Sequence, residues 1–130
     1  MGETPARSPL APAAFPDLPE IAGARFATAA AGVRYAGRDD VMLAHLAPGT
    51  AVAGVFTRST TRSAAVLDCQ DKIGGAPEGG AAILVNSGNA NAFTGRRGAE
   101  SVKAVTAAVA DRLGVAQSRV FSSSTGVIGE

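Results

Sequence analysis

The chain has 130 residues, 46% hydrophobic and 18% charged, which is the composition of a folded domain rather than of a disordered chain. Twelve basic residues against 11 acidic ones leave no overall field that would attract nucleic acid or a membrane surface. No apolar run approaches the roughly 20 residues that cross a bilayer, and the first residues lack the pattern of a secretory signal. With a single cysteine, Cys69, the sequence predicts a cytoplasmic protein whose thiol is unpaired and buried.

The first 19 residues contain five of the seven prolines. Proline lacks a backbone N–H and has a fixed φ, so this stretch cannot join a helix or a strand ladder. The sequence therefore predicts an extended arm over residues 1–19. Its apolar side chains, Phe15 and Leu18, and the following Ile21 predict that the arm lies across the body of the protein.

Three apolar segments separated by short turns follow the arm, at residues 24–35, 41–46 and 51–57. Their small and β-branched residues, joined by Gly, Asp and Pro turns, predict an antiparallel meander. The only histidine, His45, is expected on one face of the second strand. A structural role is favoured there, because no second His or Cys lies at the spacing of metal ligands.

The next part of the chain predicts a mixed α/β unit. Residues 63–68 are compatible with either a short strand or a helical turn, and residues 74–80 form a glycine-rich loop. Residues 81–86 are a continuous apolar run, as in a strand covered on both faces. A helix follows, with Gly114 as its stop signal and a strand at residues 119–123 after it. The apolar residues that recur at three- and four-residue steps in this helix are Val102, Val105, Val109 and Leu113.

The loop at residues 86–95 is rich in Asn and Gly, which tolerate left-handed backbone and offer polar groups without bulk. Between a strand and a helix, such a loop can hold an anion on free N–H groups. The spacing matches neither Gly-x-x-x-x-Gly-Lys-[Ser/Thr] nor Gly-x-Gly-x-x-Gly. The alternative interpretations of this loop are a buried structural turn and a loop that lines a site.

The segment 122–129 contains a Thr-Gly pair at the end of a predicted strand. Thr125 and Gly126 can present a hydroxyl and a backbone N–H toward one point, as the oxyanion of a tetrahedral intermediate requires. The competing interpretation is an ordinary Ser/Thr/Gly turn. A serine nucleophile is disfavoured, because the motif Gly-x-Ser-x-Gly is absent.

Two pairs of arginines, Arg58 with Arg62 and Arg96 with Arg97, lie next to predicted elements. Either pair can meet a carboxylate substrate, since guanidinium groups bind carboxylates in a bidentate way. Solvated surface positions are the favoured alternative.

Five segments taken together resemble successive motifs of the bifunctional glutamate N-acetyltransferase (ornithine acetyltransferase) family. They follow that family's order and approximate spacing within residues 16–130, at 32–40, 53–57, 64–69, 85–95 and 124–129. The resemblance implies a mixed α/β (α+β) fold like that of N-terminal nucleophile enzymes and self-cleaving aminopeptidases. Residues 20–130 would be the N-terminal portion of the α chain, an incomplete domain holding the first half of the fold.

The resemblance also implies an activity. The family transfers the acetyl group of N2-acetylornithine to glutamate in arginine biosynthesis, through an acyl-threonine intermediate. Its precursor cuts itself before a threonine, which becomes the nucleophile at the start of a β chain, and the chains assemble as an α2β2 heterotetramer. The family's oxyanion-hole pair matches Thr125 and Gly126. No resident cofactor or metal is implied, although some members also accept acetyl-CoA as donor.

The nucleophile and most substrate-binding residues of that family lie beyond position 130. None of the Gly-Ala steps in the sequence, such as those at residues 23–24 and 75–76, is followed by Thr. The expectation is therefore that this chain alone is inactive. A related self-cleaving aminopeptidase and a non-catalytic binding fragment are the alternative functions.

Overall fold

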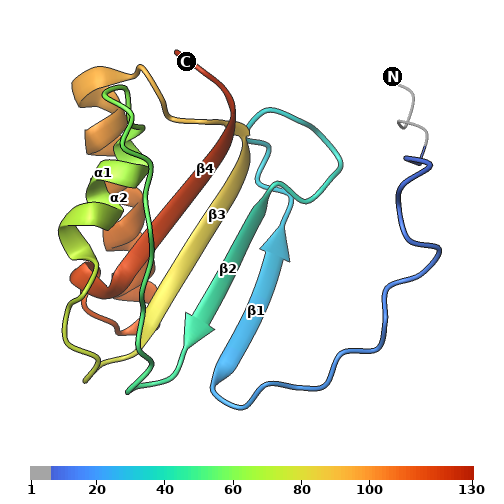
Figure 1. Ribbon diagram of the computed structural model, residues 1–130, viewed down its shortest axis with the longest axis horizontal. Helices are drawn as coiled ribbons and strands as arrows, with labels where there is room; N and C mark the ends of the chain where they lie inside the picture. The colour runs from blue at the N-terminus through green and yellow to red at the C-terminus, as the bar shows by residue number, and fades with distance from the viewer. Residues whose placement is uncertain (1–6) are drawn as a thin grey trace.

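The computed structural model describes residues 7–130, which form a four-stranded sheet with two helices beside it (Figure 1). The strands are β1 (Ala24–Ala29), β2 (Val41–Leu46), β3 (Ala81–Asn89) and β4 (Val120–Val127), in the spatial order β1-β2-β3-β4. The helices are α1 (Ala64–Lys72) and α2 (Gly95–Leu113), and a short 3-10 helix, η1 (Gln117–Arg119), precedes β4. The first three strands are antiparallel, and β4 runs parallel to β3. This is the predicted mixture of helices and strands.

The predicted meander exists, but its third strand is β3. Residues 51–57 form no strand, which corrects the expectation from the sequence. Both sides of β2 are already paired, with β1 on one side and β3 on the other, so the segment 51–57 cannot pair with β2 as a third strand of the meander. Val55 accordingly points into solvent and is 98% exposed. The first strand is also shorter than predicted and stops at Ala29.

The unit from β3 through α2 to β4 has the predicted order and carries the core. A parallel strand pair needs a crossover, and α2 provides it. Ala82 of β3, Ala110 of α2 and Val120 of β4 form the buried cluster, with Leu43 and other partly buried apolar side chains packed around it. The helix ends at the predicted residue: Gly114 has the left-handed φ of 67° and donates its N–H to the carbonyl of Ala110.

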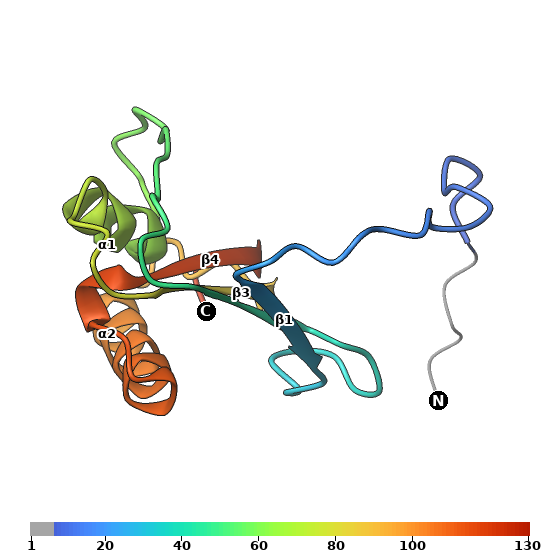
Figure 2. The same cartoon turned by 90° about the horizontal axis from the view of Figure 1, so that it is seen from below.

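Helix α1 decides the question that the sequence left open at residues 63–68. Ser63 is its N-cap, and the hydroxyl of Ser63 accepts a hydrogen bond from Val66 N at 3.3 Å. The helix lies along β4, where Cys69 Sγ and Lys72 Nζ donate to backbone carbonyls of that strand. In Figure 2 both helices lie at the β4 end of the sheet, with α1 above its plane and α2 below it.

The proline-rich arm does not lie across the body, contrary to expectation. Residues 7–21 extend away from the sheet (Figures 1 and 2), and Phe15 and Leu18 are 89% and 80% exposed. Without backbone donors at the prolines, this segment cannot pair with the outer edge of β1. Residues 1–6 of the predicted arm lie outside the described residues. Among residues 7–130, no helix is long and apolar enough to span a bilayer.

Candidate functional site

The predicted oxyanion pair lies in the last part of β4, inside the strand rather than in the loop after it. Thr125 is paired with Ser87 in the parallel ladder, and Gly126 is paired with Gly88. Both residues of the pair are exposed, although β4 begins in the core. Because the strand pairing is continuous through Thr125 and Gly126, the direction of each backbone group in this segment follows from the ladder.

The backbone of β4 alternates between β3 and the outer edge of the sheet. β4 is the outer strand, and the carbonyls of Val120 and Ser122 face outward, where side chains of α1 donate to them. The carbonyl of Val127 faces the other way and accepts from Ala90 N at 2.9 Å. Along an unbroken ladder the backbone groups of successive residues point alternately toward and away from the neighbouring strand. Gly126 lies four residues after Ser122, so its N–H also points outward. That N–H is therefore directed away from the neighbouring strand.

Gly126 occupies a position that requires glycine. Its φ of +135° lies in a region that residues with a side chain rarely adopt. A Cβ at Gly126 would also lie 2.6 Å from Gly88 O and from Asn89 N, inside the backbone of β3. The two glycines let strands β3 and β4 approach closely where the candidate donors sit.

The hydroxyl-bearing residues of β4 divide between the two faces of the sheet. Ser124 lies on the α2 side, and its hydroxyl donates to Asn86 Oδ1 of β3 at 2.7 Å. Ser123 and Thr125 lie on the opposite face, and both are exposed. Ser124 and Thr125 both lie close to Gly126 in the chain, but the hydroxyl of Ser124 is bound to Asn86. Thr125 is therefore the better candidate for a second donor beside the Gly126 N–H.

Two grooves flank α2, and neither includes the Thr-Gly pair. One, of about 790 Å³, lies between α1 and α2 and is bordered by Arg62, Asp68 and Lys103. The other, of about 900 Å³, lies between α2 and the sheet and reaches Asn86 and Ser124 at its polar end. Thr125 and Gly126 thus lie outside both of these grooves.

The Asn-rich loop predicted at 86–95 is a structural turn, and β3 continues into it as far as Asn89. Asn91 stabilises the turn with two hydrogen bonds. Asn91 N donates to Asn89 Oδ1 at 2.7 Å, and Asn91 Nδ2 donates to Gly98 O at 3.1 Å. The hydroxyl of Thr94 donates to Asn91 Oδ1 at 2.7 Å. These polar groups bind one another rather than pointing into an anion site. Ala90, next to Asn91 in the turn, donates its N–H to the carbonyl of Val127, so the turn supports the end of β4.

The other candidate side chains have structural surroundings. Cys69 is buried as predicted, and its Sγ donates to Ser122 O at 3.3 Å. Burial raises the pKa of the Cys69 thiol above its ordinary value of 9.0, so it is protonated at neutral pH and a poor nucleophile. His45 lies on β2 opposite Ala82. Among residues 7–130 no group of three His, Cys, Asp or Glu side chains could hold a metal.

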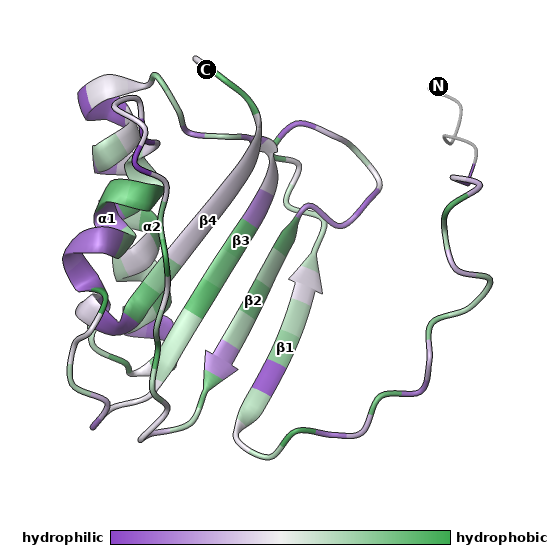
Figure 3. Cartoon of the chain, viewed as in Figure 1, coloured by the Kyte–Doolittle hydropathy of each residue, from purple (hydrophilic) through white to green (hydrophobic). Residues whose placement is uncertain are grey.

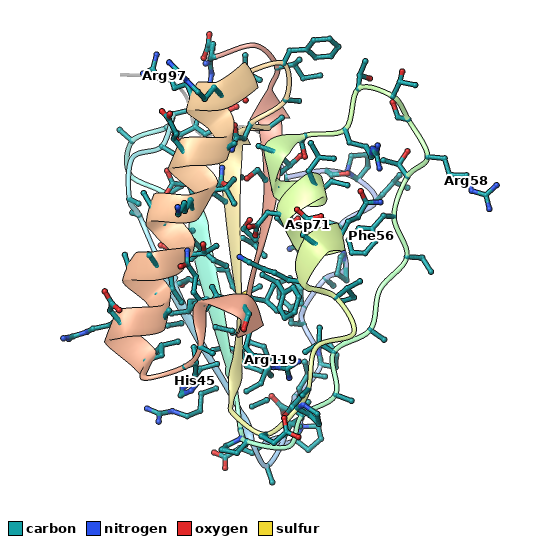
Figure 4. The ribbon with its side chains drawn as sticks, turned by 90° about the vertical axis from the view of Figure 1, so that its left-hand side faces the viewer. His45, Phe56, Arg58, Asp71, Arg97 and Arg119 are labelled. Atoms are coloured by element: carbon teal, nitrogen blue, oxygen red, sulfur yellow. The ribbon has the colours of Figure 1, made fainter. Side chains whose placement is uncertain are left out.

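The four predicted arginines do not converge. Arg62 donates to Gln70 Oε1 at 2.8 Å, and Arg96 forms a loose ion pair with Glu100 at 3.5 Å on the α2 surface. Figure 4 shows Arg58 pointing outward from its loop, while Arg97 lies at the beginning of α2. The surface interpretation therefore fits these residues better than a shared carboxylate site.

Sequence reasoning missed two buried charged residues. Arg119 is 4% exposed and donates to Thr50 O at 2.6 Å and Gly75 O at 3.3 Å, which joins two loops to the start of β4. Asp40 is also 4% exposed and accepts two backbone hydrogen bonds. The only sequence signal for Asp40 was its position directly before an apolar strand. A solvent-exposed carboxylate is equally common there, so the sequence did not indicate that Asp40 is buried.

Comparison with known proteins identifies the family of this chain. A family model described as the ArgJ family matches residues 25–130. The chain belongs to the ArgJ family. The arginine biosynthesis bifunctional protein ArgJ of Ruegeria pomeroyi is 74% identical over 123 residues, which cover 95% of this chain and 30% of that protein. The ArgJ protein of Nitrobacter winogradskyi is 55% identical over 125 residues, with the same coverage.

Solved structures of ArgJ proteins share the fold. The structure of the arginine biosynthesis bifunctional protein ArgJ from Bacillus halodurans superposes with a TM-score of 0.75 at 33% identity, covering 84% of this chain and 56% of that one. Ornithine acetyltransferase from Mycobacterium tuberculosis, solved in complex with ornithine, gives 0.69 at 38% identity, covering 84% and 58%. The predicted family and fold class are confirmed, and the self-cleaving aminopeptidase family is set aside. The chain spans about a third of the length of the curated relatives that it matches.

Proposed function

We propose that this chain is part of an enzyme that transfers the acetyl group of N2-acetylornithine to glutamate in arginine biosynthesis. Membership of the ArgJ family supports the proposal, since the curated relatives are named bifunctional arginine biosynthesis proteins. The Mycobacterium tuberculosis relative is an ornithine acetyltransferase that was solved with ornithine. The role proposed for the chain itself is to supply the oxyanion hole, with Thr125 and Gly126 as its donors.

The observation that carries this role is the direction of the Gly126 N–H. It faces the outer edge of β4, at an exposed position whose backbone is held by close contact with Gly88. Acyl transfer builds negative charge on the carbonyl oxygen of the acetyl group. A donor that already points at that oxygen stabilises the charge without having to reorganise during the reaction. The hydroxyl of Thr125, on the adjoining face, donates the second hydrogen bond.

The attacking group in this proposal comes from outside residues 7–130. A threonine at the start of a β chain attacks the acetyl carbonyl, with its own α-amine as base, and ornithine leaves with the proton that this amine took up. Glutamate then attacks the acyl-threonine ester through its amine, and N-acetylglutamate is released. The oxyanion hole serves both tetrahedral intermediates. Self-cleavage of a precursor, an α2β2 assembly in the cytoplasm and acetyl-CoA as an additional donor belong to the same proposal, as does the inactivity of the 130-residue chain by itself.

Replacing Thr125 in the complete enzyme tests the proposal. Thr125→Ala should lower kcat by about a hundredfold to a thousandfold, the usual cost of losing one oxyanion donor, with little change in KM. Thr125→Ser, which keeps the hydroxyl, should retain most of the activity. The matched control is Ser123→Ala, which removes an exposed hydroxyl two residues earlier on the same face. A Thr125→Ala enzyme with normal kcat and raised KM would assign the residue to substrate positioning and contradict the oxyanion role.

A further inference from the structure

A loop that connects β1 to β2 is held by one buried carboxylate. The side chain of Asp40 accepts hydrogen bonds from Ala31 N at 2.7 Å on Oδ1 and from Val33 N at 2.6 Å on Oδ2. Asp40 is only 4% exposed, and its own carbonyl accepts from Ser87 N of β3 at 2.8 Å. Backbone N–H groups that bind a buried carboxylate are strong, charge-assisted donors. Asp40 thus joins the loop at residues 30–34 to the end of β3.

The loop that Asp40 holds rests directly on the glycine pair of the candidate site. A Cβ at Gly88 would lie 2.8 Å from the Cβ of Arg34 and 3.4 Å from its backbone nitrogen. On its other side Gly88 is in contact with Gly126, where an added Cβ would enter the β3 backbone. Arg34, through its Cβ and backbone nitrogen, therefore packs on Gly88, which is the ladder partner of Gly126, and neither glycine places a side chain between the segments. These three residues form the Arg34–Gly88–Gly126 stack.

The contacts beyond the stack are weaker. Arg34 forms an ion pair with Glu130 at 2.7 Å, but the two side chains are 41% and 59% exposed. Exposed ion pairs of this kind contribute little to stability. The Arg34–Gly88–Gly126 stack, and not this ion pair, is the contact through which the loop can restrain the end of β4.

We infer that Asp40 is a positioning residue for the oxyanion hole, acting through the Arg34–Gly88–Gly126 stack. This inference rests on the proposed function of Thr125 and Gly126. The carboxylate keeps residues 31–34 in place, Arg34 limits the outward movement of Gly88, and Gly88 determines where the Gly126 N–H points. Neither Asp40 nor Arg34 touches the reacting atoms in this arrangement.

The variant Asp40→Asn in the complete enzyme tests the inference. An amide replaces one acceptor oxygen by a donor that faces a backbone N–H, so the loop loses a hydrogen bond and is pushed away. A displacement of about 1 Å at a reacting group can cost about a hundredfold, and we expect kcat to fall by tenfold to about a hundredfold at unchanged KM. Asp39→Asn is the matched control: the same chemical change one residue away, at an exposed carboxylate that accepts a hydrogen bond from the Thr28 hydroxyl.

A double-mutant cycle distinguishes positioning from a general loss of stability. If Asp40 acts only through the Gly126 N–H, Asp40→Asn combined with Gly126→Ala should be hardly slower than Gly126→Ala alone. Additive losses of kcat would overturn the inference, as would a normal kcat in a folded Asp40→Asn enzyme. A Thr125→Ala enzyme with normal kcat would instead defeat the proposed oxyanion function itself, so the two failures are separable.

A gentler pair of variants covers the case in which Asp40→Asn does not fold. Arg34→Gly removes the Cβ that lies against Gly88, whereas Arg34→Ala keeps it and removes only the exposed ion pair. The inference predicts a larger fall in kcat for Arg34→Gly than for Arg34→Ala. Equal kcat values for the two variants would contradict it.

Discussion

The two halves of β4 are stabilised in different ways. Its first residues are in the core: Val120 is completely buried and Phe121 is 5% exposed. Its last residues, Thr125 and Gly126 among them, are exposed, and Figure 3 shows the strand change from hydrophobic at its beginning to pale and polar toward its end. Burial of side chains holds the first half. The second half depends on backbone contacts with β3, which leave the side chains free for chemistry.

This difference predicts that variants in the two halves change different quantities. The largest effect is expected at the exposed end, for Gly126→Ala. The added Cβ meets backbone atoms of β3 at 2.6 Å and the backbone must hold an unfavourable φ, so the two strands have to separate. Because the N–H then loses its direction, kcat of the complete enzyme should fall by about a thousandfold or more, the upper end for an oxyanion donor.

The control for this variant is Gly79→Ala, the same change in a loop where an added Cβ meets nothing within 4 Å. It should leave kcat within about twofold, since surface substitutions of this kind are close to neutral. A Gly126→Ala enzyme that retains normal kcat would show that the close strand contact does not govern the reaction.

A smaller effect, on another quantity, is expected in the buried half. Val120→Ala removes two methyl groups from the cluster with Ala82 and Ala110, and it should lower the free energy of unfolding by about 2–3 kcal/mol. The kcat of the folded enzyme should change little, because Val120 is at the far end of the strand from the candidate donors. Urea denaturation and steady-state kinetics measure the two quantities, with the 98% exposed Val55 as the site of a control substitution, Val55→Ala. A loss of kcat like that of Thr125→Ala would break the distinction between the halves.

The smallest effect is expected at the junction of the halves, where Cys69 Sγ donates to Ser122 O. Burial raises the pKa of this thiol in the folded state above its ordinary value of 9.0. Below 9.0 both states are protonated and the thiol contributes no pH dependence. Above 9.0 the unfolded chain loses the proton first, so the free energy of unfolding should decline as pH rises toward the folded pKa. Denaturation below and above this value should show a shallower decline for Cys69→Ala, and an identical decline in both proteins would contradict the expected burial effect.

Local patterns predicted the elements whose signals lie within one segment. Helix α2 followed from apolar residues at three- and four-residue steps with Gly114 as its end, and β3 from a continuous apolar run. Residues 63–68 were undecided because six residues are too few to separate a period of 2 from one of 3.6, although Ser63 was a suitable N-cap. The segment 51–57 was wrongly predicted as a strand. The composition of this segment is compatible with a strand. Whether it pairs, however, depends on segments that are distant in the sequence, and β3 takes the place beside β2.

The candidate site divides in the same way. The identities of Thr125 and Gly126, and their resemblance to a family motif, were available from the sequence by itself. The direction of the Gly126 N–H depends on which strand pairs with β4 and in which register, and the role of Asp40 depends on a loop folding back onto Gly88.

The sequence alone was enough to predict the family, the mixed α/β class and helix α2, and it supplied Thr125 and Gly126 as the candidate oxyanion pair. Only the tertiary structure decided the partner of β2, the course of the arm, the outward orientation of the Gly126 N–H and the stack beneath it. The physical reason is that periodicity, capping and glycine conformation act between neighbours in the chain. Strand pairing and close backbone contact join residues that are tens of positions apart, such as Gly88 and Gly126, and no local pattern encodes their distance.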